Sequence, residues 1–255
     1  MDDVIFDLEK YKNQKTPFVL CIVTEAEGST PREAGAKMLV FADGSIKGTI
    51  GGGAIERKSI EIALQVLKRG LPLHQSFELE NDVGMICGGR TSIYFEPIKP
   101  QLSLYIFGAG HVGREVGKLA HSLGFHVCFV DNRPEIYNEF DSSYAQCIAG
   151  DYIELAESLD LKSNDMVLIT TQGHAFDGVV LEVLAPKQLL YLGMIGSKRK
   201  VGETSEKLLA GGKVTKEQLA LVDMPVGIPI KAETPLEIAV SIAAKLIDVK
   251  NLNRL

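Results

Sequence analysis

The chain has 255 residues, 45% hydrophobic and 24% charged, which is long enough for one large globular domain or two small ones. Its net charge of −6 and pI near 5.5 argue against a broad nucleic-acid-binding or anionic-membrane surface. None of its apolar runs approaches the roughly 18 residues that a membrane span requires.

Residues 1–98 predict an N-terminal α+β domain. Its expected elements, in chain order, are a helix over 1–14, strands over 18–23, 37–41 and 45–50, a helix over 54–68, and strands over 73–79 and 91–98. Asp43-Gly44 is typical of a hairpin turn. The segment 25–34, rich in Gly, Ser, Thr and Pro, is expected to be a loop. Pro97 and Pro100 bracket a short connector, where we place the domain boundary.

Residues 101–255 alternate strands with helices, which predicts a doubly wound parallel sheet. The expected strands are 103–107, 126–130, 145–149, 166–170 and 189–193, and the expected helices are 111–123, 152–158, 176–184, 198–210 and 235–249. Thr234, Pro235 and Glu237 have the spacing of a helix start with a capping box.

The most informative motif begins at the end of the first strand of this second domain. Gly108, Gly110 and Gly113 form a G-x-G-x-x-G turn that opens a helix, and Asp131 ends the next strand. In a Rossmann fingerprint these glycines allow a tight turn, the approach of a pyrophosphate, and close packing of helix and strand. The acid accepts hydrogen bonds from a ribose. His111, inside the turn, is expected to reach the phosphates. The fold class is therefore α/β, an α+β domain followed by a Rossmann-like one.

Two further glycine loops suit anions. Gly51, Gly52 and Gly53 connect a strand to a helix, and successive N–H groups in such a loop cradle an anion; a tight turn is the simpler interpretation. Ser197 and Lys198 open the helix after Gly196, where three consecutive cations oppose the helix dipole unless an anion is bound. The alternative is a solvated basic turn.

The four cysteines lack C-x-x-C spacing, so no metal site is expected. Together with an acidic N-terminal segment unlike a secretory signal, they indicate a reducing cytoplasm. Cys21, Cys128 and Cys147 fall in predicted strands and are expected to be buried. Cys87 precedes Gly88-Gly89 in a loop, where its thiol is a candidate for handling sulfur; a turn cysteine without a role is the alternative.

These segments together resemble the XdhC/CoxI family, the xanthine dehydrogenase accessory factors, over nearly the whole chain. The resemblance is carried by the segments 27–32, 35–38, 48–56, 87–89, 107–113, 191–199, 225–228 and 232–239. One position departs from the family. Gln172 replaces the first histidine of a His-x-His pattern, which leaves His174 and puts a two-histidine role in doubt.

The resemblance implies an accessory protein and not an enzyme. It implies that the chain binds molybdenum cofactor (molybdopterin), supports its sulfuration, and inserts it into a molybdenum hydroxylase such as xanthine dehydrogenase. A cysteine desulfurase is a further implied partner, and a homodimer is expected. Two alternatives stay open: an NAD(P)-dependent oxidoreductase, and a non-catalytic nucleotide-sensing regulator. Asp131 favours NAD over NADP, but Arg133 close by blurs that preference.

Overall fold

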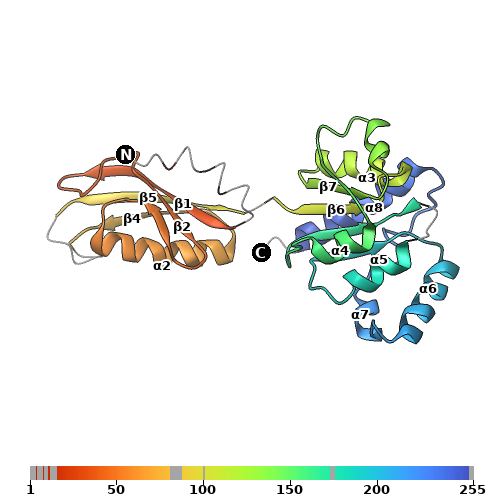
Figure 1. Ribbon diagram of the computed structural model, residues 1–255. Helices are drawn as coiled ribbons and strands as arrows, with labels where there is room; N and C mark the ends of the chain where they lie inside the picture. Colours follow the sequence, from red (N-terminus) through yellow and green to blue (C-terminus); the bar gives the residue numbers. More distant parts are fainter. Residues whose placement is uncertain are drawn as a thin grey trace. The chain divides into compact units, whose positions relative to one another are not determined.

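The computed structural model describes residues 4, 8, 11, 16–80, 88–99, 101–172 and 176–252. The chain divides into two compact units, with the break between Gln101 and Leu102 (Figure 1). We call them the N-terminal unit and the Rossmann unit and describe each by itself. Mixed α/β architecture, with an antiparallel sheet in one unit and a parallel sheet in the other, confirms the predicted fold class.

The N-terminal unit is an antiparallel five-stranded sheet in the order β3-β2-β1-β5-β4. The strands are β1 (Phe18–Glu27), β2 (Lys37–Phe41), β3 (Ile46–Gly48), β4 (Leu73–Glu78) and β5 (Arg90–Ile98), and one helix, α2 (Gly53–Arg69), packs on the sheet. Ile55, Ala63 and Val66 of α2 share a buried cluster with β1, β2, β4 and β5. This apolar stripe explains why a 17-residue segment with six charged residues folds as a helix against this sheet.

β1 is longer than predicted, because the polar residues up to Glu27 continue the strand and do not form a loop. The register with β5 shifts between Val23 and Glu25, as in a β-bulge. After the bulge, the Ser92 hydroxyl donates to the Glu25 carboxylate at 2.8 Å, and the Thr91 hydroxyl donates to its carbonyl at 3.1 Å. Partners on the neighbouring strand therefore satisfy polar residues that the sequence alone assigns to a loop.

The Rossmann unit is a parallel five-stranded sheet in the order β10-β9-β6-β7-β8. Its elements are β6 (Ser103–Phe107), α3 (His111–Ser122), β7 (His126–Asp131), the 3₁₀ helix η1 (Pro134–Asn138), β8 (Gln146–Ala149), α4 (Tyr152–Ser158), β9 (Met166–Ile169), α5 (Asp177–Leu184), β10 (Tyr191–Met194), α6 (Lys198–Gly211), α7 (Lys216–Ala220) and α8 (Pro235–Leu252). The order reverses at β6, because β7 and β8 lie on one side of it and β9 and β10 on the other. Open parallel sheets bind ligands at such a switch point, outside the carboxyl ends of the strands.

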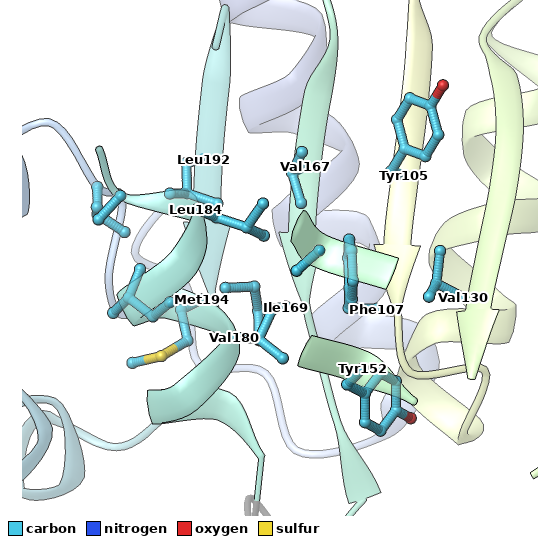
Figure 2. Packing of buried hydrophobic residues seen from close by; sticks show 14 of the residues in the cluster. Tyr105, Phe107, Val130, Tyr152, Val167, Ile169, Val180, Leu184, Leu192 and Met194 are labelled. Carbon is cyan, nitrogen blue, oxygen red and sulfur yellow. The ribbon is translucent and has the colours of Figure 1, made fainter. Parts of the chain in front are cut away.

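Helices cover both faces of this sheet, which is why the central strands β6 and β9 are buried along their whole length and are largely apolar. Leu104 and Ile106 of β6 share a cluster with α3 and α8, whereas Phe107 faces the other side. Figure 2 shows that second face, where Phe107 and Ile169 lie near Val180 of α5 and Tyr152 of α4. None of the helices in the described ranges combines the length and the hydropathy needed to cross a bilayer.

One prediction for this unit is wrong, and one short α-helix was not predicted. Cys147 is exposed, although Cys21 and Cys128 are buried as expected. The reason is that β8 is an edge strand, in which Gln146, Cys147 and Ala149 are all exposed to solvent. The short helix α7, which a Thr215–Gln218 capping box starts, was not among the predicted helices.

The far end of α3 is held by α8, which packs along it. The Lys250 ammonium donates to the carbonyl of Leu123 at 2.6 Å, just beyond the last residue of α3. The same nitrogen lies 4.9 Å from the centroid of the Phe125 ring. A cation at this end of a helix meets the negative end of the helix dipole and stabilises it.

Candidate functional site

The glycine turn after β6 owes two of its glycines to backbone packing. Gly108 has a φ of +111°, and a Cβ there would lie 2.2 Å from the carbonyl oxygen of Thr170. A Cβ on Gly113 would lie 2.0 Å from the carbonyl oxygen of Gly108. Gly110 differs, because a Cβ on it would meet nothing within 4 Å. The turn is therefore tightly packed against β9 and its own helix, and it is open in front of Gly110.

The N-terminus of α3 opens into that space. Its N-cap is Gly110, no side chain caps it, and its first turn contains no acid. The first N–H groups of a helix have no partner within the helix and carry a partial positive charge. They border a cavity of about 550 Å³, which we call the α3 cleft. Its walls come from the carboxyl ends of β6, β7, β9 and β10, and include His111, Arg114, Arg133, Gln172, Ile195 and Pro235.

Asp131, predicted as a ribose acceptor, is fully buried beside this cleft. Arg133 donates to Oδ1 from Nε at 2.8 Å and from its backbone N–H at 3.1 Å, and to Oδ2 from Nη2 at 2.9 Å. The Ala109 N–H donates to Oδ2 at 2.8 Å. Burial acts to raise the pKa of Asp131, but the bonds from Arg133 and Ala109 hold it below its ordinary value. The carboxylate is thus ionised and fully engaged within the protein.

Two arginines line the α3 cleft, and each is paired. Arg133 makes a third side-chain contact, from Nη1 to Oε1 of Gln172 at 2.7 Å. Arg114 donates from Nε to the Ala109 carbonyl at 2.8 Å, forms an ion pair with Glu139, and stacks on Phe140 with its guanidinium carbon 4.7 Å from the ring centroid. These contacts hold both guanidinium groups in fixed positions at the cleft wall.

A second cavity of about 540 Å³ shares Ile195 with the α3 cleft. Its walls are mainly apolar, from the loop 225–230 and from Ile238 of α8, with Lys198 and Ser241 as polar members. Lys198 therefore lies at a cavity, as a ligand-binding role requires. Ser197 serves as the N-cap of α6, where its hydroxyl accepts the Lys200 N–H at 3.3 Å.

Lys200, the third cation of that turn, is explained by a buried partner. Its Nζ lies 2.8 Å from Oδ2 of Asp177, which is fully buried at the start of α5. The Thr171 N–H and hydroxyl both donate to Oδ1 of the same carboxylate, at 3.0 and 2.5 Å. Burial raises the pKa of Asp177 to about 6 and lowers that of Lys200. Asp177 thus ties β9, α5 and α6 together; His174 lies outside the described residues.

The N-terminal unit brings three sequence-predicted segments together at one place. A Cβ on Gly51 would lie 2.6 Å from Cγ of Pro31, and one on Gly89 would lie 2.4 Å from the carbonyl oxygen of Ser29. The loops 28–32, 51–53 and 88–89 are therefore in contact. Cys87, next to the last of them, lies outside the described residues.

A carboxylate from the first turn of α2 lies beside the residues that lead into the Gly51–Gly53 loop. Glu56 accepts the Thr49 hydroxyl and, at 3.3 Å, the N–H of Ile50. Gly52 and Gly53 both have positive φ, and a Cβ on either would meet nothing within 4 Å. The loop thus leaves open space at the start of α2, whose N-cap has no side-chain hydrogen bond. Within the described ranges no group of three or more His, Cys, Asp or Glu is placed to hold a metal ion.

Comparison with known proteins identifies the family. Residues 104–246 match the family model described as the XdhC Rossmann domain, which covers more than half of the chain. Residues 12–78 match the model described as the XdhC and CoxI family. The chain belongs to the XdhC and CoxI family. This confirms the resemblance drawn from the motifs.

Individual relatives agree with membership of the XdhC and CoxI family. The protein YqeB of Escherichia coli (strain K12) is 37% identical over 98% of this chain and 46% of its own length. A protein of Bacillus subtilis (strain 168), named as a probable xanthine dehydrogenase subunit, is 28% identical over 63% of this chain and 46% of its own length. The chain thus spans about half the length of the curated relatives it matches.

A crystal structure described as a xanthine dehydrogenase from Bacillus halodurans aligns with a TM-score of 0.53 and 24% identity, over 99% of this chain and 97% of that chain. This likeness extends to both units and shows the fold.

Sequence reasoning missed much of the wall of the α3 cleft in this XdhC and CoxI family member. Arg114 follows the last fingerprint glycine directly, so one turn of helix places it beside the turn; this was a usable signal. Gln172 stands out in the sequence only as a departure from the family pattern, yet it accepts a hydrogen bond from Arg133. Their sequence separation of 39 residues explains why no local pattern indicated the contact.

Proposed function

We propose that this protein is an accessory factor, without an enzymatic activity of its own, that binds molybdenum cofactor and inserts it into a molybdenum hydroxylase of the xanthine dehydrogenase type. The observation that carries the proposal is the uncapped N-terminus of α3, which opens into the α3 cleft in an XdhC Rossmann domain. The Bacillus subtilis relative, whose name refers to xanthine dehydrogenase, supports the choice of partner.

The chemistry of the two cavities fits such a cargo. Molybdopterin carries a phosphate, and the free N–H groups at Gly110 to Gly113 are the donors that a helix N-terminus offers to a phosphate. Its heterocyclic ring system fits a pocket with mainly apolar walls and a few polar groups. The second cavity, which adjoins at Ile195, has such walls in Val226, Ile228 and Ile238.

The experiment is to purify the protein from a host that makes molybdenum cofactor, and to measure bound pterin fluorescence, molybdenum and nicotinamide absorbance. We expect pterin and molybdenum near one equivalent, and transfer that activates a cofactor-free hydroxylase. A bound nicotinamide without pterin would instead favour the NAD(P)-dependent oxidoreductase. Empty protein that also fails to activate the hydroxylase would refute the proposal. Sedimentation of the same preparation tests the homodimer that we propose as the functional unit.

Lys198 gives a prediction for the second cavity. Replacing Lys198 and Arg199 together by alanine is expected to weaken pterin cofactor binding about three- to tenfold and to reduce its salt dependence, since a cation is lost beside the anionic cargo. Titration at two ionic strengths measures both. Arg199→Ala alone is the matched control: its side chain is 88% exposed and lies 3.7 Å from Glu203, so no change is expected. Unchanged binding by the double variant at low salt would show a merely solvated turn.

We further propose that Cys87 supports sulfuration in the reducing cytoplasm. Its thiolate attacks the outer sulfur of a persulfide on a cysteine desulfurase, which forms a persulfide on Cys87 and releases the desulfurase cysteine as a thiolate. Support comes from its position in the sequence directly before Gly88 and Gly89, since Gly89 contacts the loop 28–32. The Cys87→Ser variant is expected to keep the fold and the bound pterin, and to deliver a cofactor that leaves the hydroxylase largely inactive. Full activation by this variant would contradict the proposal.

Thiol labelling provides a second readout for Cys87, once the other cysteines are accounted for. Cys21 and Cys128 are buried, and burial raises the pKa of Cys21 to about 12, so both should label slowly. Cys147 is exposed and should react, so the assay needs a Cys147→Ser background. In that background we expect one fast thiol, Cys87, protected by bound cofactor.

A further inference from the structure

Asp131 lies beside the α3 cleft at the position where NAD-binding proteins bind the ribose. NAD-binding Rossmann units place an acid here to accept the ribose 2′-hydroxyl. An ionised carboxylate has about four lone-pair sites. Asp131 accepts four hydrogen bonds, two at each carboxylate oxygen, and all of them come from Arg133 and Ala109. The side chain is also fully buried. It therefore has no acceptor left for a ribose.

Arg133, by contrast, has donors to spare. A guanidinium has five N–H groups. Nε and Nη2 each spend one on Asp131, and Nη1 spends one on Gln172, which leaves one N–H on each terminal nitrogen. The side chain is 24% exposed and lines the α3 cleft. Its two remaining donors, one on each terminal nitrogen, are charged N–H groups of the kind that bind phosphate oxygens.

The surroundings of Arg133 leave these two N–H donors able to bind an anion. Gln172 orients the Arg133 guanidinium through a neutral amide, which leaves the positive charge of the guanidinium in place. A carboxylate at this position would neutralise that charge. The acid exposed in the cleft wall, Glu139, is held by Arg114. The uncapped start of α3 and His111 line the same cavity. The Glu135 carboxylate also acts on Arg133 but does not line the cleft, so the groups that a ligand meets beside Arg133 are mainly N–H donors and the positive end of α3.

We propose that Arg133, positioned by Asp131 and Gln172, binds a phosphomonoester dianion at the place where NAD-binding units hold ribose hydroxyls. The inference rests on the proposed ligand-binding role of the α3 cleft and specifies the group recognised there. Two sources share this chemistry: the single phosphate of a pterin, which Arg133 and the start of α3 in the same cavity would then bind together, or a 2′-phosphate on a nucleotide. In both cases the unphosphorylated counterpart binds poorly.

Two probe pairs, titrated into full-length protein stripped of bound cofactor, test the proposal and separate the sources. One pair is 2′,5′-ADP and 5′-AMP; the other is a pterin phosphomonoester and its unphosphorylated alcohol. We expect at least one pair to show a preference of about tenfold or more for the phosphorylated member, as for a charge-assisted pair. Arg133→Ala should reduce that preference to about twofold or less.

Arg133→Ala leaves the Asp131 carboxylate buried without its cationic partner, which by itself destabilises the fold. Two further variants therefore separate loss of binding from loss of the fold. The Asp131→Asn/Arg133→Ala double variant removes the orphaned charge and should also lose the preference. Gln172→Ala keeps the Asp131 pair and should lower the preference about threefold.

The proposal is overturned if neither pair shows a preference in the wild type, or if a preference survives both arginine variants. These outcomes are independent of whether cofactor co-purifies or activates a hydroxylase, so failure of the proposed function is recognised separately.

Discussion

Gly113→Ala is expected to lower the free energy of unfolding of the Rossmann unit by about 3 kcal/mol or more. The added methyl would lie 2.0 Å from the carbonyl oxygen of Gly108 and 3.2 Å from Oγ1 of Thr170, so backbone must move to admit it. Elsewhere in a helix the same change usually stabilises, by up to about 1 kcal/mol. The sign of the effect, measured by urea unfolding, therefore tests the packing of the turn directly.

Gly110→Val is the matched variant for the same turn. Its side chain meets open space and the backbone there is extended, so the free energy of unfolding should change by less than about 1 kcal/mol. Cofactor binding should fall about tenfold or more, because the valine fills the room in front of α3. Binding within about twofold of wild type would show that the fingerprint has a structural role alone.

Lys200→Met is expected to destabilise the Rossmann unit by about 3 kcal/mol at about pH 8, because Asp177 remains buried after its cationic partner is lost. The Thr171 hydrogen bonds to Asp177 remain in this variant, but they supply no positive charge. Urea unfolding across a pH series measures the effect. The double variant Asp177→Asn/Lys200→Met should recover most of the lost stability, since no buried charge is left; a double variant as unstable as the single would contradict the ion-pair account.

The pH dependence of this pair has a definite sign. The pKa of Asp177 is raised from its ordinary 3.8 to about 6 in the folded protein. Its carboxyl therefore contributes most stability below about pH 3.8, and that contribution is lost as the pH rises through about 6. In Lys200→Met the folded-state pKa should rise further. The penalty relative to wild type should thus be large at about pH 8 and small at about pH 5, where Asp177 is protonated.

Much of the fold follows from local patterns along the chain. Apolar strands that end in glycine turns, such as the one before Gly108, predicted the order of elements in the Rossmann unit, and Thr234 and Glu237 form the predicted capping box. Prediction failed where the conformation or exposure of a residue depends on a neighbouring strand. Glu25 belongs to β1 because Ser92 and Thr91 supply its partners, and Cys147 is exposed because β8 lies at a sheet edge.

The candidate site shows the same division. The sequence pattern located Gly110 and His111, and the structure places both at the α3 cleft. The sequence pattern could not predict that the hydrogen-bond partners of Asp131 come from within the protein. The chain turns between β7 and η1, and this turn brings both the backbone N–H and the guanidinium of Arg133 to Asp131, so that the acid binds Arg133 and not a ligand. Lys200 illustrates the point too, because its partner Asp177 is 23 residues away.

The contact between Lys250 of α8 and the end of α3 limits where this protein can be truncated for experiments. The match to the XdhC Rossmann domain ends at residue 246, four positions before Lys250. A shortened protein cut at that family border would lose the ammonium that neutralises the end of α3 at Leu123 and lies over Phe125. Because the opposite end of α3 faces the cleft, such a fragment is a poor reference for ligand affinity. Fragments that retain the last turns of α8 are the appropriate ones.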